Sequence, residues 1–489
     1  MNRFLSGCLV LFICVCAIPA LAADESHLPT FLKLRLDSLN VSPQDVHIFV
    51  KGVDADHPLL SDGASEAVSP ASTMKLVTTY AALQLLGPAD VFHTEVYVRG
   101  TVKDGVLHGD LVFQGGGDPD LTLERFWLML RAIRRAGIRT ILGNLILDDS
   151  YYSLPAYDPG AFDGYPYEVY NTGPNALLVN FDASRFYLEP SDQGVKITAD
   201  PPMSLIQVVN QIKLVGGNCN DYGNNLDIKV LAVHPRVRVR LEGPYAVQCG
   251  KQVVNYRILD NTSYVGALFS SIWAELGGKF LGHVQKGTVR AEDERILDWK
   301  SRPLAAIVRD MNKFSNNVMA RNLFLDLSTT NPADLASARK VVRDFLVGSG
   351  LDFPELVIVN GSGLSRKARI SAEHLGELLE SAWHSPVMPE FVASLPLLGR
   401  DGTLRKRLRN GPEAGMGHIK TGTLDNTDAI AGYLEDARGG RWVVVCIVDN
   451  TSEAKAKVIE DALLKWVYKP PLKSVIQSRS NEGHRASIL

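Results

Sequence analysis

The chain has 489 residues, of which 46% are hydrophobic and 21% charged, a balance that is typical of a globular protein and excludes a disordered or fibrous one. The formal net charge of −3, without a dense basic run, gives no indication of a nucleic-acid partner. The length is enough for roughly three domains.

The first segment resembles a secretory signal peptide. Arg3 supplies a positive charge, an apolar run covers 4–18, and Ala20-Leu21-Ala22 forms an A-x-A cleavage site. The run is shorter than the roughly twenty residues of a spanning helix. We therefore expect a signal peptide at 1–22 and an exported, periplasmic protein. Since no second segment is apolar enough to span a bilayer, we expect at most peripheral membrane contact.

The cysteines of the mature chain fit that compartment. Cys219 and Cys249 lie in a polar region and could pair in an oxidising space. Cys446 lies in an apolar strand and is expected to be a buried free thiol. The sequence contains no C-x-x-C pair and no His/Cys cluster, so we expect no metal and no cofactor.

The predicted elements change in character along the chain. A strand at 46–52 and an apolar helix from Ser72 to Gly87 are followed, from Thr94, by alternating strands around the turn Asp104-Gly105. Further expected elements are a helix at 121–136, a strand at 141–147, helices at 261–276, 302–327, 333–348 and 371–384, strands at 428–435 and 441–449, and a helix at 452–468.

This order predicts an α+β fold. The catalytic domain would be discontinuous, made of 23–93 and 260–470, with an antiparallel sheet flanked by helices. A large β-rich insert at 94–259, expected to form two small subdomains, would split it, and 471–489 would be a polar tail.

A serine lies three residues before a lysine at three places in the chain. At 337–340 the lysine is expected to be solvated on a helix, and at 452–455 the serine is expected to cap a helix. Ser72 and Lys75 differ, because they lie at the start of an apolar helix and share one face. A lysine in an apolar cleft near another cation holds its proton weakly and can act as a base.

Two later motifs supply the missing groups. Ser315-Asn316-Asn317 is a Ser-x-Asn motif at the start of a helix, and Lys420-Thr421-Gly422-Thr423 enters a strand. Each has a plain structural alternative, because Ser315 could cap its helix and Lys420 could be a solvated strand-end charge. The order Ser-x-x-Lys, Ser-x-Asn, Lys-Thr-Gly on an exported protein is nevertheless that of penicillin-binding proteins and β-lactamases.

The chain therefore resembles the penicilloyl-serine transferase superfamily, most closely the penicillin-binding protein 4 type of D-alanyl-D-alanine carboxypeptidase/endopeptidase. The 240 residues between Lys75 and Ser315 fit the large insert of that type. The resemblance implies a β-lactamase/transpeptidase-like domain and covers nearly the whole mature chain. Its further stretches are GGGDPDLT (115–122), YNTGPNALLVNF (170–181), NGSGLSR (360–366) and GRDGTL (399–404). We assign no catalytic role to the glycine-rich turns.

The resemblance also implies a role for each motif residue. Ser72 would be the nucleophile, Lys75 the general base, Ser315 a proton relay toward the leaving amine, Asn317 a ligand of the acyl-side amide, and Lys420 the neighbouring cation.

The remaining expected roles concern substrate binding. The hydroxyls of Thr421 and Thr423 would meet the substrate carboxylate, and Gly422 would let a substrate backbone approach the strand edge. The backbone N–H groups of Ser72 and Thr423 would form the oxyanion hole.

The function implied is a periplasmic serine DD-peptidase. Its partners would be peptidoglycan peptides, cleaved as a carboxypeptidase or endopeptidase, and β-lactam antibiotics as covalent inhibitors; a homo-oligomer is left open. The alternatives are a catalytically silent peptidoglycan-binding or β-lactam-sensing module, and a β-lactamase or esterase. Because Glu168-Val-Tyr-Asn171 is one residue short of a Glu-x-x-x-Asn loop, we expect no dedicated deacylating glutamate and a long-lived penicilloyl adduct.

Overall fold

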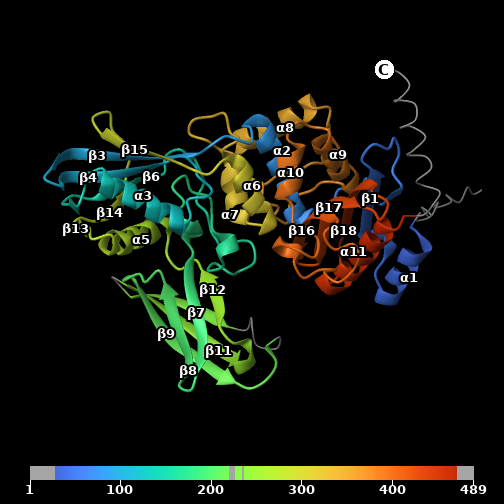
Figure 1. Ribbon diagram of the computed structural model, residues 1–489, viewed down its shortest axis with the longest axis horizontal. Coiled ribbons are helices and arrows are strands. Elements are labelled where there is room, and N and C mark those ends of the chain that lie inside the picture. Colours follow the sequence, from blue (N-terminus) through green and yellow to red (C-terminus); the bar gives the residue numbers. More distant parts are fainter. Residues whose placement is uncertain (1–27, 220–225, 234–235, 471–489) are drawn as a thin grey trace, which may run out of the picture.

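The computed structural model describes residues 28–219, 226–233 and 236–470, so the expected signal peptide and polar tail lie outside the described residues. Figure 1 shows three parts: a sheet with its helices at one end, a smaller group of strands below it, and a sheet covered by helices at the other end. Within the part of the chain that is described, none of the helices combines the length and apolarity needed to span a bilayer.

The sheet at the helix-rich end joins the two ends of the sequence. Its five strands run in the order β16-β17-β18-β1-β2, with β1 paired antiparallel to β18 so that Phe49 lies opposite Val445. All but the first residue of β18 are buried, because helices cover both faces. The strands are β1 (Val46–Gly52), β2 (Leu60–Asp62), β16 (Gly417–Leu424), β17 (Thr427–Glu435) and β18 (Arg441–Val448).

The helices divide between the two faces of this sheet. On one face α1 (Thr30–Leu39) packs with α11 (Glu453–Tyr468), and on the other α9 (Ala372–Trp383) contacts β18 and β1. The short turn η2 (Ala71–Met74) leads into α2 (Lys75–Leu85), which is buried among the helices of the second face. The other helices of this face are α6 (Leu304–Lys313), α7 (Asn317–Leu325), α8 (Leu335–Gly348) and α10 (Met388–Ser394).

The prediction of one helix over 302–327 is wrong. The structure has two helices, α6 and α7, with a break at Ser315, whose φ of 54° lies in the left-handed region. The helix predicted from Ser72 is also corrected at its start, because Ser72 lies in the 3₁₀ turn η2 and α2 begins at Lys75. Both corrections concern motif residues.

The part at the other end is built on a seven-stranded sheet with α3 (Leu123–Arg135) and α5 (Asn261–Glu275). The predicted Asp104-Gly105 turn joins β3 to β4, and both residues have the positive φ that a type I′ hairpin requires. Its strands are β3 (His93–Lys103), β4 (Val106–Gly115), β5 (Thr140–Ile141), β6 (Leu145–Asp148), β13 (Lys279–Phe280), β14 (Val284–Lys286) and β15 (Glu294–Lys300).

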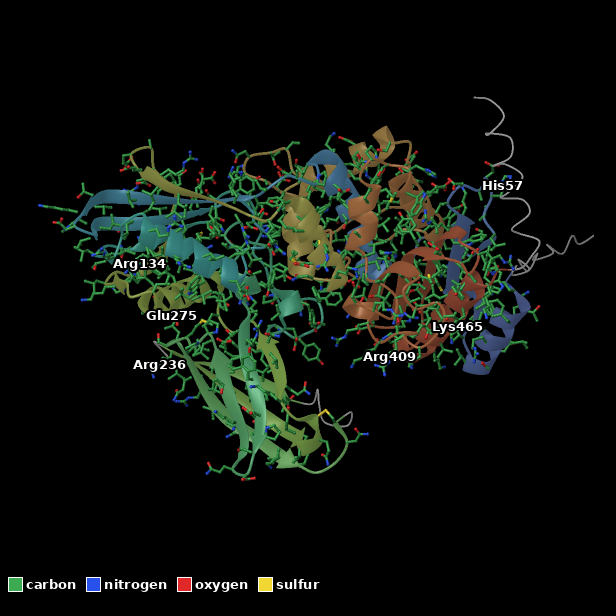
Figure 2. All side chains as sticks on the ribbon, viewed as in Figure 1. His57, Arg134, Arg236, Glu275, Arg409 and Lys465 are labelled. Atoms are coloured by element: carbon green, nitrogen blue, oxygen red, sulfur yellow. A yellow bond between two sulfur atoms is a disulfide. The ribbon has the colours of Figure 1, made fainter. Side chains whose placement is uncertain are left out.

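The smaller group of strands contains two three-stranded sheets, of order β12-β7-β8 and β10-β11-β9. A disulfide joins Cys219 to Cys249 in this group (Figure 2), while Cys446 is the buried free thiol expected. The strands are β7 (Ser184–Ser191), β8 (Gly194–Asp200), β9 (Ile206–Val215), β10 (Asp227–Val233), β11 (Arg236–Ala246) and β12 (Gln252–Tyr256).

The insert ends later than the predicted residue 259. Helix α5 packs its Phe269 and Trp273 into the same hydrophobic cluster as Phe113, and β15 pairs with β3. The hydrophobic core of the helix-rich part resumes only at Leu304. Residues 261–300 therefore belong with the insert. The sequence did not indicate this, because an apolar helix has the same period in either domain.

Candidate active site

The three predicted motifs meet at the edge strand β16. Turn η2 packs against β16 and β17, α2 contacts α7, and the break between α6 and α7 faces the same place, so the elements labelled α2, α7 and β16 lie together at the centre of Figure 1. Lys75 and Lys420 are fully buried there, while Ser72 and Ser315 are partly exposed above them. Two partly exposed hydroxyls therefore lie over two buried amines.

Lys75 has three polar partners. Its Nζ lies 2.9 Å from the Oγ of Ser72, 2.6 Å from the Oδ1 of Asn317 and 2.7 Å from the backbone oxygen of Ser362. Burial, and next the charges of Lys420 and Arg321, lower the pKa of Lys75 well below its usual value.

These contacts suit a neutral Lys75 acting as a base. A neutral amine has two protons and one lone pair. It can donate to Asn317 and Ser362 and still accept the Ser72 proton, since the amide and carbonyl oxygens only accept. The geometry therefore aims the lone pair of Lys75 at Ser72 Oγ, which is the arrangement that nucleophile activation requires.

Lys420 forms the second part of the cluster. Its Nζ donates to Ser315 Oγ at 2.8 Å and to the backbone oxygen of Thr421 at 2.6 Å. Burial lowers the pKa of Lys420 to about 7. The alternative of a solvated strand-end charge is excluded, because this lysine is 0% exposed.

The Ser-x-Asn segment places its two polar side chains on different partners. Asn316 caps α7, its Oδ1 accepting from the N–H groups of Val318 and Met319, so Ser315 is not the cap. The left-handed backbone of Ser315 turns its hydroxyl toward Lys420, and Asn317 faces Lys75. With its oxygen engaged by Lys75, Asn317 still has its Nδ2 group to offer a substrate.

Strand β16 presents part of its backbone at the open edge of the sheet. Ile419 N donates to Pro396 O across the outer edge, and edge-facing groups recur every second residue, so the N–H groups of Thr421 and Thr423 also point outward. Beyond the short pairing of Leu397 with His418 no strand covers this edge among the described residues. An extended peptide can therefore pair with it.

Gly422 also makes a close contact within the chain. A Cβ built there would lie 2.7 Å from the backbone nitrogen of Ser72 and 3.0 Å from both Ala71 Cβ and Pro70 O. The side of Gly422 that lacks a side chain therefore faces the turn of the nucleophile. Gly422 lets η2 approach β16, which brings the N–H of Ser72 near the edge strand.

The two threonine hydroxyls have partners within the chain. Thr421 Oγ1 lies 2.9 Å from Thr403 Oγ1, which belongs to the GRDGTL stretch. Thr423 Oγ1 donates to Asp428 Oδ1 at 2.9 Å. Thr423 would have to give up that bond to meet a substrate carboxylate, whereas the exposed pair of Thr421 and Thr403 offers two hydroxyls at one point.

The sequence analysis missed two further groups. The backbone oxygen of Ser362, in the NGSGLSR loop, contacts Lys75, and Gly363 of that loop packs so closely that its Cβ would lie 1.8 Å from Ala71 O. Two glycines of positive φ, Gly361 and Gly363, could have indicated a loop wrapped against another segment. Arg321 gave no signal, because a charged residue on a helix usually faces water.

The other serine–lysine pairs have the structural roles expected. Lys340 is 74% exposed and pairs with Asp344, while Ser337 Oγ accepts from Thr329 N. Ser452 stands at the N-cap position of α11, as expected, but its side chain accepts no capping hydrogen bond. Neither pair touches the site residues.

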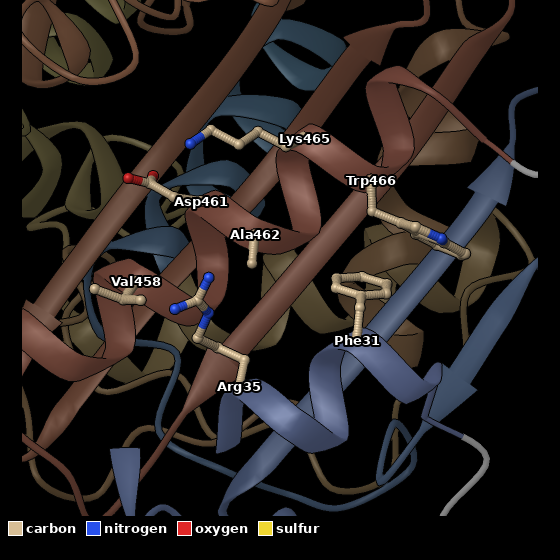
Figure 3. Close-up of a pocket in the computed structure, with 7 residues that line it drawn as sticks. All are labelled: Phe31, Arg35, Val458, Asp461, Ala462, Lys465 and Trp466. Atoms are coloured by element: carbon tan, nitrogen blue, oxygen red, sulfur yellow. The ribbon is translucent and has the colours of Figure 1, made fainter. Parts of the chain in front are cut away.

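A groove of about 520 Å³ lies elsewhere, between α1 and α11 (Figure 3). Phe31 and Trp466 stack at one end of it, and Arg35 and Lys465 flank it. It lies on the sheet face opposite α2 and contains none of the predicted site residues. Across the described residues no cluster of His, Cys, Asp and Glu could hold a metal ion.

Comparisons with known proteins identify the family of the chain. The profile of the D-Ala-D-Ala carboxypeptidase 3 (S13) family matches residues 34–469. D-alanyl-D-alanine carboxypeptidase DacB of Haemophilus influenzae is 27% identical over 451 residues, covering 88% of this chain and 92% of its own. A D-alanyl-D-alanine carboxypeptidase of an Actinomadura species is 28% identical over 470 residues, covering 91% and 86%.

Solved structures give the fold. The crystal structure of penicillin binding protein 4 from Haemophilus influenzae superposes with a TM-score of 0.73 at 24% identity, covering 90% of this chain and 99% of that one. The same protein complexed with a β-lactam superposes with a TM-score of 0.71 at 23% identity. The expected β-lactamase/transpeptidase-like fold is therefore confirmed.

Proposed function

The chain belongs to the D-Ala-D-Ala carboxypeptidase 3 (S13) family, and on that premise we propose a periplasmic serine DD-peptidase acting on peptidoglycan stem peptides. The relatives named as D-alanyl-D-alanine carboxypeptidases support the substrate class, and the neighbour complexed with a β-lactam supports binding of that class of antibiotic. The bond cleaved would be D-Ala-D-Ala, or the D-Ala–diamino acid bond of a cross-bridge.

The first chemical step is acylation of Ser72. Its hydroxyl proton passes to the neutral amine of Lys75 while Oγ bonds to the substrate carbonyl carbon. The resulting oxyanion would accept hydrogen bonds from the N–H groups of Ser72 and Thr423. The C–N bond then breaks: the leaving nitrogen takes the proton of the Ser315 hydroxyl, and Ser315 takes one from protonated Lys75, so that Lys75 is neutral again for the second step.

The second step is hydrolysis of the ester. A water molecule gives its proton to Lys75, bonds to the acyl carbon, and releases Ser72 with its proton restored. Asn317 would hold the acyl-side amide through its free Nδ2 group. The positive charge of Lys420 disfavours a proton on Lys75 in both steps.

One observation carries this proposal. Lys75 is fully buried, has a strongly lowered pKa, and lies 2.9 Å from the hydroxyl of Ser72 at an open strand edge. A structural lysine would be satisfied by a carboxylate, and here its three partners are a hydroxyl, an amide oxygen and a carbonyl oxygen. These three partners suit a base beside a nucleophile, because the absence of a carboxylate from the set helps to keep the amine deprotonated.

The test is to incubate the mature protein with benzylpenicillin and to locate the adduct by peptide mass, with Ser72→Ala as the control. A penicilloyl group on Ser72 that is absent from Ser72→Ala supports the proposal. Release of D-alanine from a D-Ala-D-Ala peptide then distinguishes a peptidase from a silent sensor. No adduct on the folded protein would contradict the assignment of Ser72.

A further inference from the structure

Arg321 is a buried cation without a counterion. It is 4% exposed, and its Nη1 donates to the backbone oxygens of Tyr170, at 3.1 Å, and of Thr172. Its guanidinium lies 5.7 Å from the ring centre of Tyr157, and its Nε has no hydrogen-bond partner. No carboxylate of the described residues pairs with it.

This is an unusual state for an arginine. Buried charges are normally paired, because burial removes the hydration of the ion. The same chain follows that rule at Arg407, which is also mostly buried and pairs with both Glu460 and Asp461. Burial lowers the pKa of Arg321, but a guanidinium stays protonated near neutral pH, and no carboxylate in the described part of the chain neutralises this one.

The position of Arg321 on α7 determines which group its charge acts on. It lies one helical turn after Asn317 on α7, so the two side chains share a face. Asn317 Oδ1 contacts Lys75 Nζ at 2.6 Å, and Arg321 is close enough for its charge to act on that amine. Tyr157, Tyr170 and Thr172, which hold Arg321, all belong to the insert (Figure 1).

We propose that Arg321 is a positioning residue of the acylation site: the insert holds its uncompensated guanidinium one helical turn from Asn317, where its charge acts on the amine of Lys75. This inference rests on the proposed role of Lys75 as the base. It assigns the insert a part in catalysis, since the carbonyl groups of 170–172 keep the cation in place.

The charged groups around Lys75 leave few other sources for such an effect. Lys420 faces it from β16 and Arg321 from α7, and both lower the pKa of Lys75 after the larger effect of burial. The NGSGLSR loop contributes a backbone carbonyl, and α2 contributes no charged group to this contact. Around Arg321 itself, Tyr157 is the titratable group whose charge acts on it among the described residues.

The test measures the rate of acylation by benzylpenicillin over roughly pH 5 to 9 for four proteins. They are the wild type, Arg321→Met, Arg321→Lys and the control Arg339→Met. Arg339 is matched because it also donates to two backbone oxygens, of Ile358 at 2.9 Å and Val359 at 2.6 Å. Its charge is not among those that lower the pKa of Lys75.

The expected result follows from the sign of the interaction. Removing a cation raises the pKa of Lys75, so the rising limb of the profile of Arg321→Met moves to higher pH by about one unit. On the acidic side its rate falls roughly tenfold, and at high pH it approaches that of the wild type. Arg321→Lys restores the profile, and Arg339→Met leaves the limb where it is.

Two outcomes overturn the inference. One is a rate lowered by the same factor at every pH, which is what a loosened contact between α7 and the insert would produce. The other is a pH profile of Arg321→Met that superimposes on that of the wild type, whether or not the rate changes with pH. Thermal unfolding of each variant checks that it is folded. A wild type that forms no adduct on Ser72 contradicts the proposed function instead, so the two failures are distinguishable.

Discussion

Replacing Gly422 by alanine would separate the nucleophile from the edge strand. The new Cβ would lie 2.7 Å from Ser72 N and 3.0 Å from Ala71 Cβ and Pro70 O. Two of these atoms belong to the backbone, so no flexible side chain can move aside. The turn η2 must instead shift away from β16, or β16 must bend outward.

The size of the shift sets the loss of rate. Unbonded heavy atoms approach to about 3.4–3.5 Å, so η2 and β16 must separate by about 0.7 Å. A hydrogen bond of about 2.9 Å lengthened by that amount is no longer a hydrogen bond. One of the two oxyanion donors, Ser72 N or Thr423 N, would then miss the oxyanion, which costs roughly 100- to 1,000-fold in rate. The Lys75–Ser72 contact survives, because both residues move with the turn.

The assay is the rate of penicilloylation, with Gly417→Ala as the control on the same strand. The Cβ at 417 would meet the Cδ1 atoms of Ile419, at 2.9 Å, and of Leu434, at 3.1 Å, which are flexible ends that can rotate away. We expect Gly417→Ala to acylate within a few-fold of the wild type. A folded Gly422→Ala that acylates at the wild-type rate would refute the oxyanion hole described here.

Three further predictions follow from the site. Lys420→Met should flatten the pH dependence of stability: the folded pKa of Lys420, about 7, lies below its unfolded value. Between these two pKa values the unfolded state binds one proton more than the folded state. In chemical denaturation, the free energy of unfolding of the wild type should therefore rise with pH in that range by up to about 1.4 kcal/mol per pH unit relative to the variant. Equal slopes would contradict it. Thr403→Val, which removes the hydroxyl 2.9 Å from Thr421 Oγ1, should raise KM for a D-Ala-D-Ala peptide roughly tenfold with kcat little changed; an unchanged KM would count against a carboxylate site there. Finally, the penicilloyl adduct on Ser72 should persist for many minutes, and nitrocefin turnover at many cycles per second would disprove the absence of a deacylating base.

Local chemistry made much of this fold predictable. The Asp104-Gly105 turn has one compatible hairpin type, and the strands β16 to β18 follow from short apolar runs separated by turns. Residue types and the order of the motifs were also enough to select Ser72, Lys75 and Lys420 as candidate site residues. A serine activated by a lysine needs a second cation nearby, and few sequences supply one. The comparisons confirm the family and the fold, while the role of each residue stays a prediction until it is tested.

What the sequence could not give depends on contacts between distant segments. The apolar period continues from α6 into α7 and predicted one helix over 302–327, although the Ser-x-Asn motif was itself expected at the start of a helix and Asn316 is a good cap. The NGSGLSR loop reads as a turn until Ser362 O is seen against Lys75. Arg321 reads as a surface charge until the insert covers it.

The junction between the insert and the rest of the chain shows what the insert adds. His93 lies opposite Lys300, so the insert leaves and returns at one point and could have been added without changing the order of the sheet around β18. Such a junction requires no other contact. Yet α7, which carries the second motif, buries two polar side chains against the insert: Asn322 Nδ2 donates to Asn175 O at 2.9 Å, and Asp326 Oδ1 accepts from Tyr152 at 2.6 Å. Polar groups buried at a seam fix its geometry, because each loses a partner if α7 slides. The insert is therefore placed to hold Asn317 against Lys75, and a catalytic domain without it would have to stabilise α7 by other means.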